Sequence, residues 1–282
     1  MKNMMDFGGV IEHGIPEFRL ERKILDDTVN KILKLGINVE CNKELGKDFT
    51  ISDLEKEYDA IFLSFGKNIS SKMGIEGEEK EGVFGGNELL ENKIYPDFKG
   101  KRVAVIGGGN VAMDTSRTIK RLGASNVTVI YRRSEEEMPA EKIEIEEAKE
   151  DGVEFLFQTN VLKILGKREV EQIECIKTEL VQKEGEARKV PIDIKGSNFL
   201  MDINYVIMAV GSTVEKPLID ALNLNTTKQG TIEINENCMT SKEKVFAGGD
   251  LAGAKGTVAW AARSGRDAAE NIKKYLLCKE VK

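Results

Sequence analysis

Three glycines in the segment VAVIGGGNVAMD (residues 103–114) have the spacing that lets a peptide backbone approach phosphate groups closely. The pattern Gly107-x-Gly109-x-x-Ala112 directly follows an apolar run and opens a helical pattern, and this context makes the fingerprint specific. Gly107 permits a tight turn, Gly109 admits a pyrophosphate, and Ala112 allows a helix to pack closely on a strand. The N–H groups of the first helical turn then favour negative charge. The segment predicts a dinucleotide site, with an ordinary glycine-rich turn as the alternative.

Two arginines stand where the next strand is expected to end, in the segment YRRSEEEMP (residues 131–139). A site for NAD usually has Asp or Glu there, about 20 residues after the fingerprint, to accept from the ribose 2'-hydroxyl. Arg132 and Arg133 instead offer two guanidinium groups, which match a 2'-phosphate in charge and in hydrogen-bonding geometry. We therefore expect NADPH rather than NADH. The alternative is that both arginines form surface ion pairs with the acidic residues 135–137.

A third group of residues with binding chemistry lies near the C-terminus, in the segment VFAGGDLAGAKGTVAW (residues 245–260). A short strand is expected to end at Gly248-Gly249-Asp250, and a helix of small residues is expected to begin at Thr257. An Asp held at a strand end can accept from a sugar-alcohol hydroxyl, and a helix start offers N–H donors to a carbonyl or ring nitrogen. A flavin carries all of these groups. The alternative is a plain strand, turn and helix in which Asp250 caps locally.

The elements that would position these residues alternate between short apolar β-branched runs and amphipathic helical stretches, which is typical of parallel α/β folds. We expect strands at residues 37–41, 60–64, 102–106, 127–131, 153–157, 172–177, 205–210 and 245–248. We expect helices at residues 20–35, after residue 109, at 141–150 and at 257–277. A capping box of Ser52 and Glu55 predicts a further short helix. Residues 70–86 are expected to form a surface connection, and residues 183–198 a hairpin or exposed loop.

Length and composition exclude several classes of protein. A chain of 282 residues is long enough for about two domains. Its net charge of −6, with both signs interspersed, argues against nucleic acid or an anionic membrane as a partner. The four cysteines form no C-x-x-C pair, which argues against a disulfide framework, a metal centre and a thiol relay. No apolar run approaches the length of a membrane span. We therefore expect a cytoplasmic protein that binds no metal.

Four segments together resemble one family. They are GGVIEHGIPEFRL, GGGNVAMDTSRT, YRRSEEEMPA and VFAGGDLAGAKGTVAWAARSGRDAA, and they follow the family's order over essentially the whole chain. They resemble the glutamate synthase small subunit group of NADPH- and FAD-dependent oxidoreductases. Relatives of that group include the flavin region of dihydropyrimidine dehydrogenase and the larger subunit of NADH-dependent ferredoxin:NADP oxidoreductases. The resemblance implies hydride transfer from NADPH to FAD, and electron transfer onward to a partner protein or iron–sulfur centre.

The resemblance also implies an α/β fold of two Rossmann-like dinucleotide-binding domains, of the pyridine nucleotide-disulfide oxidoreductase type. The implied division is an FAD-binding part at residues 1–95, an inserted NAD(P)H-binding domain at 96–211 and a second FAD-binding part at 212–282. The loop at residues 8–16 is implied to cover the flavin ring system. Gly66 and Gly211 are implied hinges, and Gly211 is also counted with the cofactor-binding residues. The other implied residues are Gly107, Gly108, Gly109, Asn110, Val111, Arg132 and Arg133 for NADPH, and Gly249, Asp250, Thr257 and Val258 for FAD.

The resemblance begins after the family's first strand, helix and strand, which carry the fingerprint for the FAD pyrophosphate. It also begins after the family's N-terminal domain with iron–sulfur clusters. We therefore expect the first βαβ unit of the FAD-binding domain to be missing, which would expose a sheet edge. Three explanations are open: another polypeptide supplies the missing half, the flavin is bound weakly or not at all, or the sequence is part of a longer protein.

The resulting hypothesis is a flavoprotein oxidoreductase, or a subunit of one, with a redox partner. Hydride transfer requires orientation of cofactors rather than a nucleophile or base, so we expect no catalytic side chain, and the single histidine, His13, is assigned no role. A flavin-free NADPH-binding or structural subunit of a larger redox complex is the alternative. An NADP-dependent dehydrogenase of the alcohol type is a weaker third hypothesis, because no Tyr/Lys or metal-ligand set accompanies the fingerprint.

Overall fold

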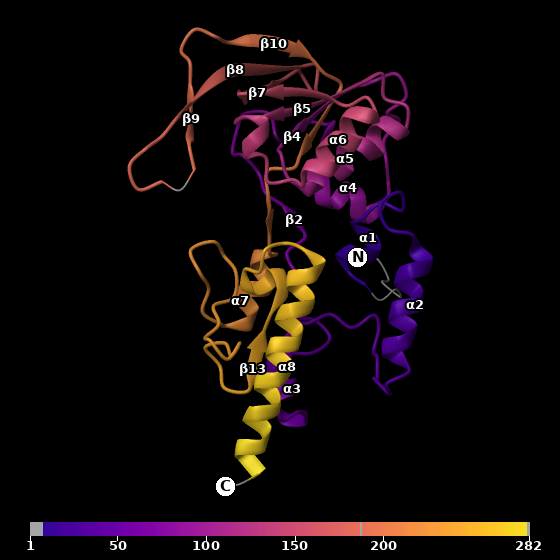
Figure 1. Ribbon diagram of the computed structural model, residues 1–282, viewed down its shortest axis with the longest axis vertical. Coiled ribbons are helices and arrows are strands. Elements are labelled where there is room, and N and C mark those ends of the chain that lie inside the picture. Colours follow the sequence, from indigo (N-terminus) through magenta and orange to yellow (C-terminus); the bar gives the residue numbers. More distant parts are fainter. Residues whose placement is uncertain (1–7, 187, 281–282) are drawn as a thin grey trace. The chain divides into compact units, whose positions relative to one another are not determined.

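The computed structural model describes residues 8–186 and 188–280, and Figure 1 shows their helices and strands. The chain folds into two compact units, and the second is inserted into the sequence of the first. Of the described residues, the first unit contains 8–13, 17–69 and 213–280. The second unit contains residues 14–16 and 70–212.

A five-stranded parallel sheet forms the centre of the second unit. Its strands lie in the order β3-β11-β4-β5-β6. They span Val83–Gly85 (β3), Tyr205–Met208 (β11), Arg102–Ile106 (β4), Asn126–Tyr131 (β5) and Glu154–Phe157 (β6). Almost every residue of β4 and β5 is buried, as expected of a parallel sheet that is covered on both faces.

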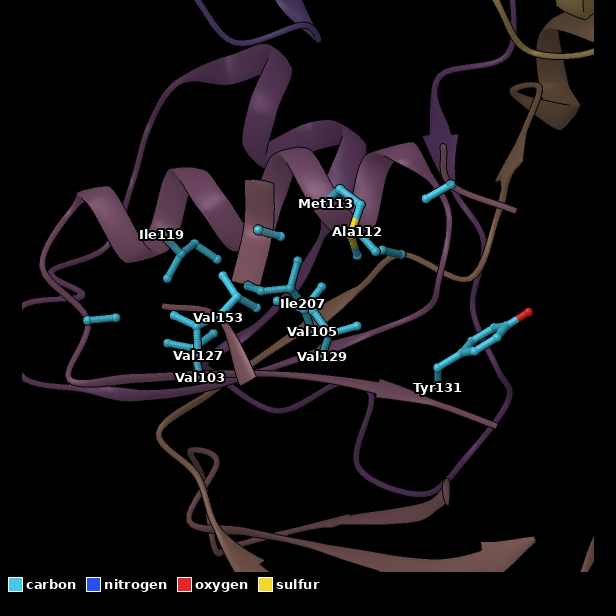
Figure 2. Close-up of a cluster of buried hydrophobic side chains, with 14 of the residues drawn as sticks. Val103, Val105, Ala112, Met113, Ile119, Val127, Val129, Tyr131, Val153 and Ile207 are labelled. Atoms are coloured by element: carbon cyan, nitrogen blue, oxygen red, sulfur yellow. The ribbon is translucent and has the colours of Figure 1, made fainter. Parts of the chain in front are cut away.

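Helices cover one face of this sheet. They are α4 (Gly86–Asn92), α5 (Asn110–Arg121) and α6 (Lys142–Glu150), and the 3-10 helix η1 (Glu135–Glu137) precedes α6. Helix α5 turns Ala112, Met113 and Ile119 towards the sheet (Figure 2). Because side chains alternate between the two faces of a strand, alternate residues of the sheet meet this helix. Those residues are Val103, Val105, Val127 and Val129.

An antiparallel sheet covers the other face. Its strands are β7 (Thr159–Leu165), β8 (Gln172–Val181), β9 (Val190–Asp193) and β10 (Phe199–Asp202). The long strand β8 pairs with all three of the others, and it forms a hairpin with β9 that extends from the sheet (Figure 1). Ile164 and Ile173 of this sheet share a second core with Ala104 and Ile130 of the parallel sheet.

The first unit is built around two parallel strands, β1 (Ile61–Leu63) and β13 (Val245–Ala247), with Phe62 opposite Phe246. Its core joins these strands to buried side chains of the surrounding helices, including Ile51, Ile219 and Leu251. The helices of this unit are α1 (Val10–His13), α2 (Arg22–Leu33), α3 (Ile51–Glu57), α7 (Lys216–Leu222), the 3-10 helix η2 (Gly249–Ala252) and α8 (Val258–Glu280).

Two short strands mark the places where the chain enters and leaves the long segment of the second unit, residues 70–212. Strands β2 (Ile69–Ser70) and β12 (Ser212–Thr213) pair with each other in a two-stranded sheet. Next to them, the Ser71 N–H donates to the Gly211 carbonyl at 2.9 Å. Gly66 and Gly211 have φ angles of 73° and 133°, in the range that favours glycine.

The structure corrects two expectations about the first unit. Residues 37–41 form no strand, because within the described chain no strand pairs with them, and Ile37 and Val39 are exposed. The capping box of α3 is Thr50 with Asp53, not Ser52 with Glu55. The Thr50 hydroxyl accepts from the Asp53 N–H at 3.2 Å, and the Asp53 carboxylate accepts from the Thr50 N–H at 3.0 Å. The helix starts this early because its first residue, Ile51, is buried in the core.

Two expected loops also contain regular structure. Residues 8–16 include the short helix α1, and residues 70–86 include β3, which joins the parallel sheet with Val83 opposite Val206. Apolar side chains of β3 and α4 pack into the cores of the second unit, as Val83 and Leu89 show. For this reason residues 70–95 belong to the second unit, whereas the predicted division put them in the first. None of the described helices is both long and apolar enough to cross a bilayer.

Candidate functional site

The glycine-rich turn after β4 contains three glycines with different surroundings. A Cβ atom on Gly107 would lie 2.1 Å from the Ala209 carbonyl oxygen, and the φ of Gly107 is +141°. A Cβ atom on Gly108 would lie 2.7 Å from the ring of Tyr131. A Cβ atom on Gly109 would meet only Pro139, at 3.8 Å. The fold itself therefore requires Gly107 and Gly108, whereas the space in front of Gly109 is open.

Helix α5 begins directly at this turn. Gly109 is its N-cap and has no side chain that could satisfy the first N–H groups of the helix. Asn110 and Val111 form the first turn and are partly exposed. Because the first N–H groups of a helix have no acceptor within it and lie at the positive end of its dipole, the start of α5 can bind an anion.

The two predicted arginines lie at the end of β5, the strand next to β4. Arg132 is exposed, and its carbonyl accepts from the Thr178 hydroxyl at 2.8 Å. Arg133 is partly buried and donates from Nε to the Lys189 carbonyl at 3.1 Å. In the described part of the chain neither arginine pairs with residues 135–137, and Glu135 pairs with Lys149 instead. The local ion pairs considered as an alternative are therefore not formed, and both guanidinium groups keep hydrogen-bonding capacity.

The second unit also has a pocket that the sequence did not reveal. Its volume is about 460 Å³, and it lies between residues 136–139 and the β8–β9 hairpin residues Gln182, Arg188 and Lys189. The hairpin contributes two cations close to the chain segment that follows the arginine pair. The only signal in the sequence was the Arg188-Lys189 doublet, which stands in a polar stretch where surface charges are common.

In the first unit, Gly248, Gly249 and Asp250 follow β13. A Cβ atom on Gly248 would lie 2.6 Å from the Ser264 hydroxyl and 2.8 Å from the ring of Phe62. Gly249 has a φ of +65° and donates its N–H to the Ser264 hydroxyl at 2.9 Å. These contacts bind the strand end to α8 and fix the position of Asp250.

Asp250 has an unusual environment for a carboxylate. Its Oδ1 atom is buried and has no hydrogen-bond partner among the described residues. Burial raises the pKa of Asp250 above its ordinary value, against the opposing effects of the Lys67 charge and the Gly256 N–H. Because a buried acceptor without a partner is costly, this oxygen is suited to a ligand that brings a hydroxyl or N–H donor.

Helix α8 begins close to Asp250, and η2 packs against it. The Thr257 hydroxyl accepts from the Trp260 N–H at 3.4 Å, and the Thr257 carbonyl accepts from the Ala261 N–H at 2.9 Å. Thr257 therefore acts as the cap, and Val258 is the first helical residue. Val258 and Trp260 are both exposed, which leaves this helix start accessible.

The predicted site residues thus fall into two groups. Residues 107–111 and the arginine pair lie at the ends of neighbouring strands in the second unit, where ligands of open α/β sheets usually bind. Gly211 follows the end of β11, the strand on the other side of β4. Gly249, Asp250, Thr257 and Val258 form a separate group in the first unit.

Comparison with known proteins identifies relatives over most of the chain. The subunit beta of NADP(+)-dependent formate dehydrogenase from Moorella thermoacetica is 35% identical over an alignment of 276 positions, which covers 95% of this chain and 39% of the relative. The glutamate synthase (NADPH) small chain of Halomonas elongata is 32% identical over an alignment of 288 positions, which covers 96% of this chain and 61% of the relative. The chain therefore spans only about two fifths to three fifths of the length of these curated relatives.

Solved structures show the same fold. FprA from Mycobacterium tuberculosis in complex with NADPH has a TM-score of 0.82 at 20% identity, covering 96% of this chain and 76% of that one. Thioredoxin reductase from T. acidophilum has a TM-score of 0.62 at 20% identity, and the match covers 77% of this chain and 66% of that one. The predicted α/β fold is thereby confirmed. A model of the pyridine nucleotide-disulphide oxidoreductase family matches residues 11–268. The chain belongs to the pyridine nucleotide-disulphide oxidoreductase family.

Proposed function

We propose that this chain is an NADPH- and FAD-dependent oxidoreductase, or a subunit of one, of the glutamate synthase small subunit type. One observation carries this proposal: an open helix start at Gly109 lies beside a strand end with two arginines that form no ion pair within the described chain. Curated relatives named for NADP(+) and NADPH support it.

In this proposal residues 107–111 and the arginine pair hold NADPH. The open space at Gly109 admits a pyrophosphate to the backbone, and the first N–H groups of α5 neutralise part of its charge. Arg132 and Arg133 bind the 2'-phosphate with guanidinium groups, which distinguishes NADPH from NADH. Gly108 supports the turn because only a glycine fits over the Tyr131 ring.

The first unit fits a flavin in the residues that the structure describes there. Asp250 Oδ1 is a buried acceptor without a partner, and a ribityl hydroxyl is a matching donor. Thr257 and Val258 present the N–H groups of the accessible α8 start to an electron-rich edge of a ligand. Gly249 gives Asp250 its position through the hydrogen bond to Ser264.

When bound, a flavin supplies the two-electron acceptor for a hydride from reduced nicotinamide. The chain's own residues then bind, orient and neutralise charge, and none of them needs to act as nucleophile or base. Relatives named small chain and subunit beta, including the NADPH-Fe(3+) oxidoreductase subunit beta of Geobacter sulfurreducens, support a partner polypeptide that receives the electrons. We place this activity in the cytoplasm, without nucleic acid or membrane as a partner.

The test is a visible absorbance spectrum of the purified chain, alone and with its candidate partner, followed by anaerobic addition of NADPH and, separately, NADH. We expect a flavin spectrum that NADPH bleaches. Substituting both Arg132 and Arg133 by Ala should weaken NADPH binding by about 100-fold or more and NADH binding far less, because each charge-assisted bond is worth about 1.5–3 kcal/mol and two are lost.

Arg168→Ala is the matched control, because Arg168 is an exposed arginine of the same unit that pairs with Glu81. It should leave the binding of both nucleotides unchanged. Equal losses of NADPH and NADH in the double variant would show that the arginines do not recognise the 2'-phosphate. Stabilisation by NADPH without any flavin spectrum would favour a flavin-free NADPH-binding subunit instead.

A further inference from the structure

The β8–β9 hairpin is joined to the chain segment that follows β5. Arg133 Nε donates to the Lys189 carbonyl at 3.1 Å. The Arg188 guanidinium donates to the Glu137 carbonyl and lies 3.4 Å from the Tyr131 hydroxyl. The Tyr131 hydroxyl donates to the same Glu137 carbonyl at 2.9 Å. These contacts hold the hairpin beside the predicted 2'-phosphate residues, although the two segments are more than 50 residues apart in sequence.

Lys189 differs from Arg188 in how its side chain is used. Its backbone carbonyl is fixed by Arg133, whereas in the described part of the chain no hydrogen bond or ion pair holds its ammonium group. The side chain is exposed and lines the pocket of about 460 Å³. The structure thus positions the backbone of a lysine whose ammonium group has no direct partner in the described chain. Its charge acts on Glu136, another residue of the pocket: hydrogen bonds from the Glu136 backbone and from Ser134, and to a smaller extent the Lys189 charge, lower the pKa of Glu136.

The pocket has further properties of a nucleotide site. Met138 and Pro139 give it apolar surface, and its volume is in the range of about 300–1,000 Å³ that is usual for small-molecule sites. Glu137 Oε2 is buried and has no hydrogen-bond partner among the described residues, so it can accept from an amino or hydroxyl group. Cations, an apolar surface and an acceptor without a partner are together complementary to a phosphorylated nucleoside.

We propose that this pocket takes the adenosine 2'-phosphate end of NADPH, and that Lys189 is a third phosphate-binding residue beside Arg132 and Arg133. Arg188 is a positioning residue, since its guanidinium group holds the hairpin against residues 131–137. Glu137 Oε2 accepts a hydrogen bond from the nucleoside. This inference rests on the proposed NADPH function and extends its binding site to a hairpin distant in sequence.

The test is calorimetric titration of the full chain with two probes, 2',5'-ADP and 5'-AMP, which differ in the 2'-phosphate. Lys189→Ala should weaken binding of 2',5'-ADP by about tenfold, the loss expected from one charge-assisted bond, and should change 5'-AMP binding by less than about twofold. Lys189→Arg should restore the affinity for 2',5'-ADP. Lys183→Ala is the matched control, because Lys183 is an exposed lysine of the same hairpin that does not line the pocket.

Equal losses in Lys189→Ala and Lys183→Ala would overturn the inference, because the effect would then be one of net charge. The inference would also be overturned if Lys189→Ala kept its affinity for 2',5'-ADP while the separate variant Arg133→Ala lost it. In that case the proposed NADPH function would stand. Failure of the unsubstituted chain to prefer 2',5'-ADP over 5'-AMP would overturn the NADPH function together with the inference. Unchanged melting temperatures of the lysine variants show that the fold is kept.

Discussion

Substitution of Gly109 by Ala should separate nucleotide binding from folding. The added Cβ meets only Pro139 at 3.8 Å, an ordinary van der Waals distance, and the φ of −97° at Gly109 is available to alanine. Alanine is a poorer N-cap than glycine, but it also lowers the entropy of the unfolded chain, which raises the free energy of unfolding by about 0.4–1 kcal/mol. These effects oppose each other, so we expect a change in unfolding free energy within about 0.5 kcal/mol and in melting temperature within about 2 °C.

Binding should respond very differently. A methyl group at Gly109 occupies the space through which a pyrophosphate reaches the backbone, so at least one charge-assisted hydrogen bond of about 1.5–3 kcal/mol should be lost. NADPH affinity should therefore fall by about 10- to 100-fold. The measurements are thermal unfolding without nucleotide and a fluorescence titration with NADPH.

Gly107→Ala is the contrasting variant. Its Cβ would lie 2.1 Å from the Ala209 carbonyl oxygen at a φ of +141°, so the main chain must move and folding itself should suffer by about 2 kcal/mol or more. Undiminished NADPH binding by Gly109→Ala would refute the reasoning, because the pyrophosphate could not then lie against this residue. A large loss of stability in Gly109→Ala would equally refute it, since the glycine would then serve the fold.

Three further predictions concern titratable groups. Burial raises the pKa of Asp250, so the stability that this group contributes is present below its unfolded pKa of about 3.9 and is lost as pH rises through its pKa in the folded protein. In flavin-free protein, Asp250→Asn should therefore raise the melting temperature at neutral pH and leave it unchanged near pH 4. An equal effect at both pH values would contradict this. Burial alone would raise the pKa of Asp151, but hydrogen bonds from Arg117 and Arg121 lower it below its ordinary value. Arg117→Met should therefore reduce the free energy of unfolding, measured in urea, by about 1–3 kcal/mol at neutral pH and by progressively less as pH falls below about 4. A reduction that does not depend on pH would rule out the ion pair. Burial raises the pKa of the Cys175 thiol to about 12, so mass spectrometry should find maleimide on the exposed Cys278 and none on Cys175 unless the protein is unfolded.

Local patterns were sufficient to predict most of the parallel sheet. The runs at 102–106 and 127–131 are continuous, apolar and β-branched, and such runs become buried strands in α/β folds. The run at 37–41 has a similar composition but forms no strand, because a strand needs a hydrogen-bonding neighbour, and no local pattern specifies one. For the same reason, the sequence did not predict that β3 pairs with β11, more than 100 residues later.

The candidate site shows the same division. The turn at Gly107 and the helix start at Gly109 are local features, and their spacing was sufficient to predict them. The unpartnered oxygen of Asp250 and the contact between Arg133 and Lys189 arise only when distant segments pack together. The sequence could therefore indicate the glycine-rich turn and helix start that we propose as a phosphate site, but not that a distant hairpin lies beside the arginine pair.

The pairing of β2 with β12 has a consequence for how this architecture can be recombined. Apart from residues 14–16, the second unit is one segment from Ser70 to Ser212, and these two positions lie in paired strands. An inserted domain whose ends are adjacent adds little strain to its host, and it can be removed or replaced at a single place. A short linker from residue 69 to residue 213 should close the first unit, and residues 70–212 form a module that gene fusion can exchange as one piece.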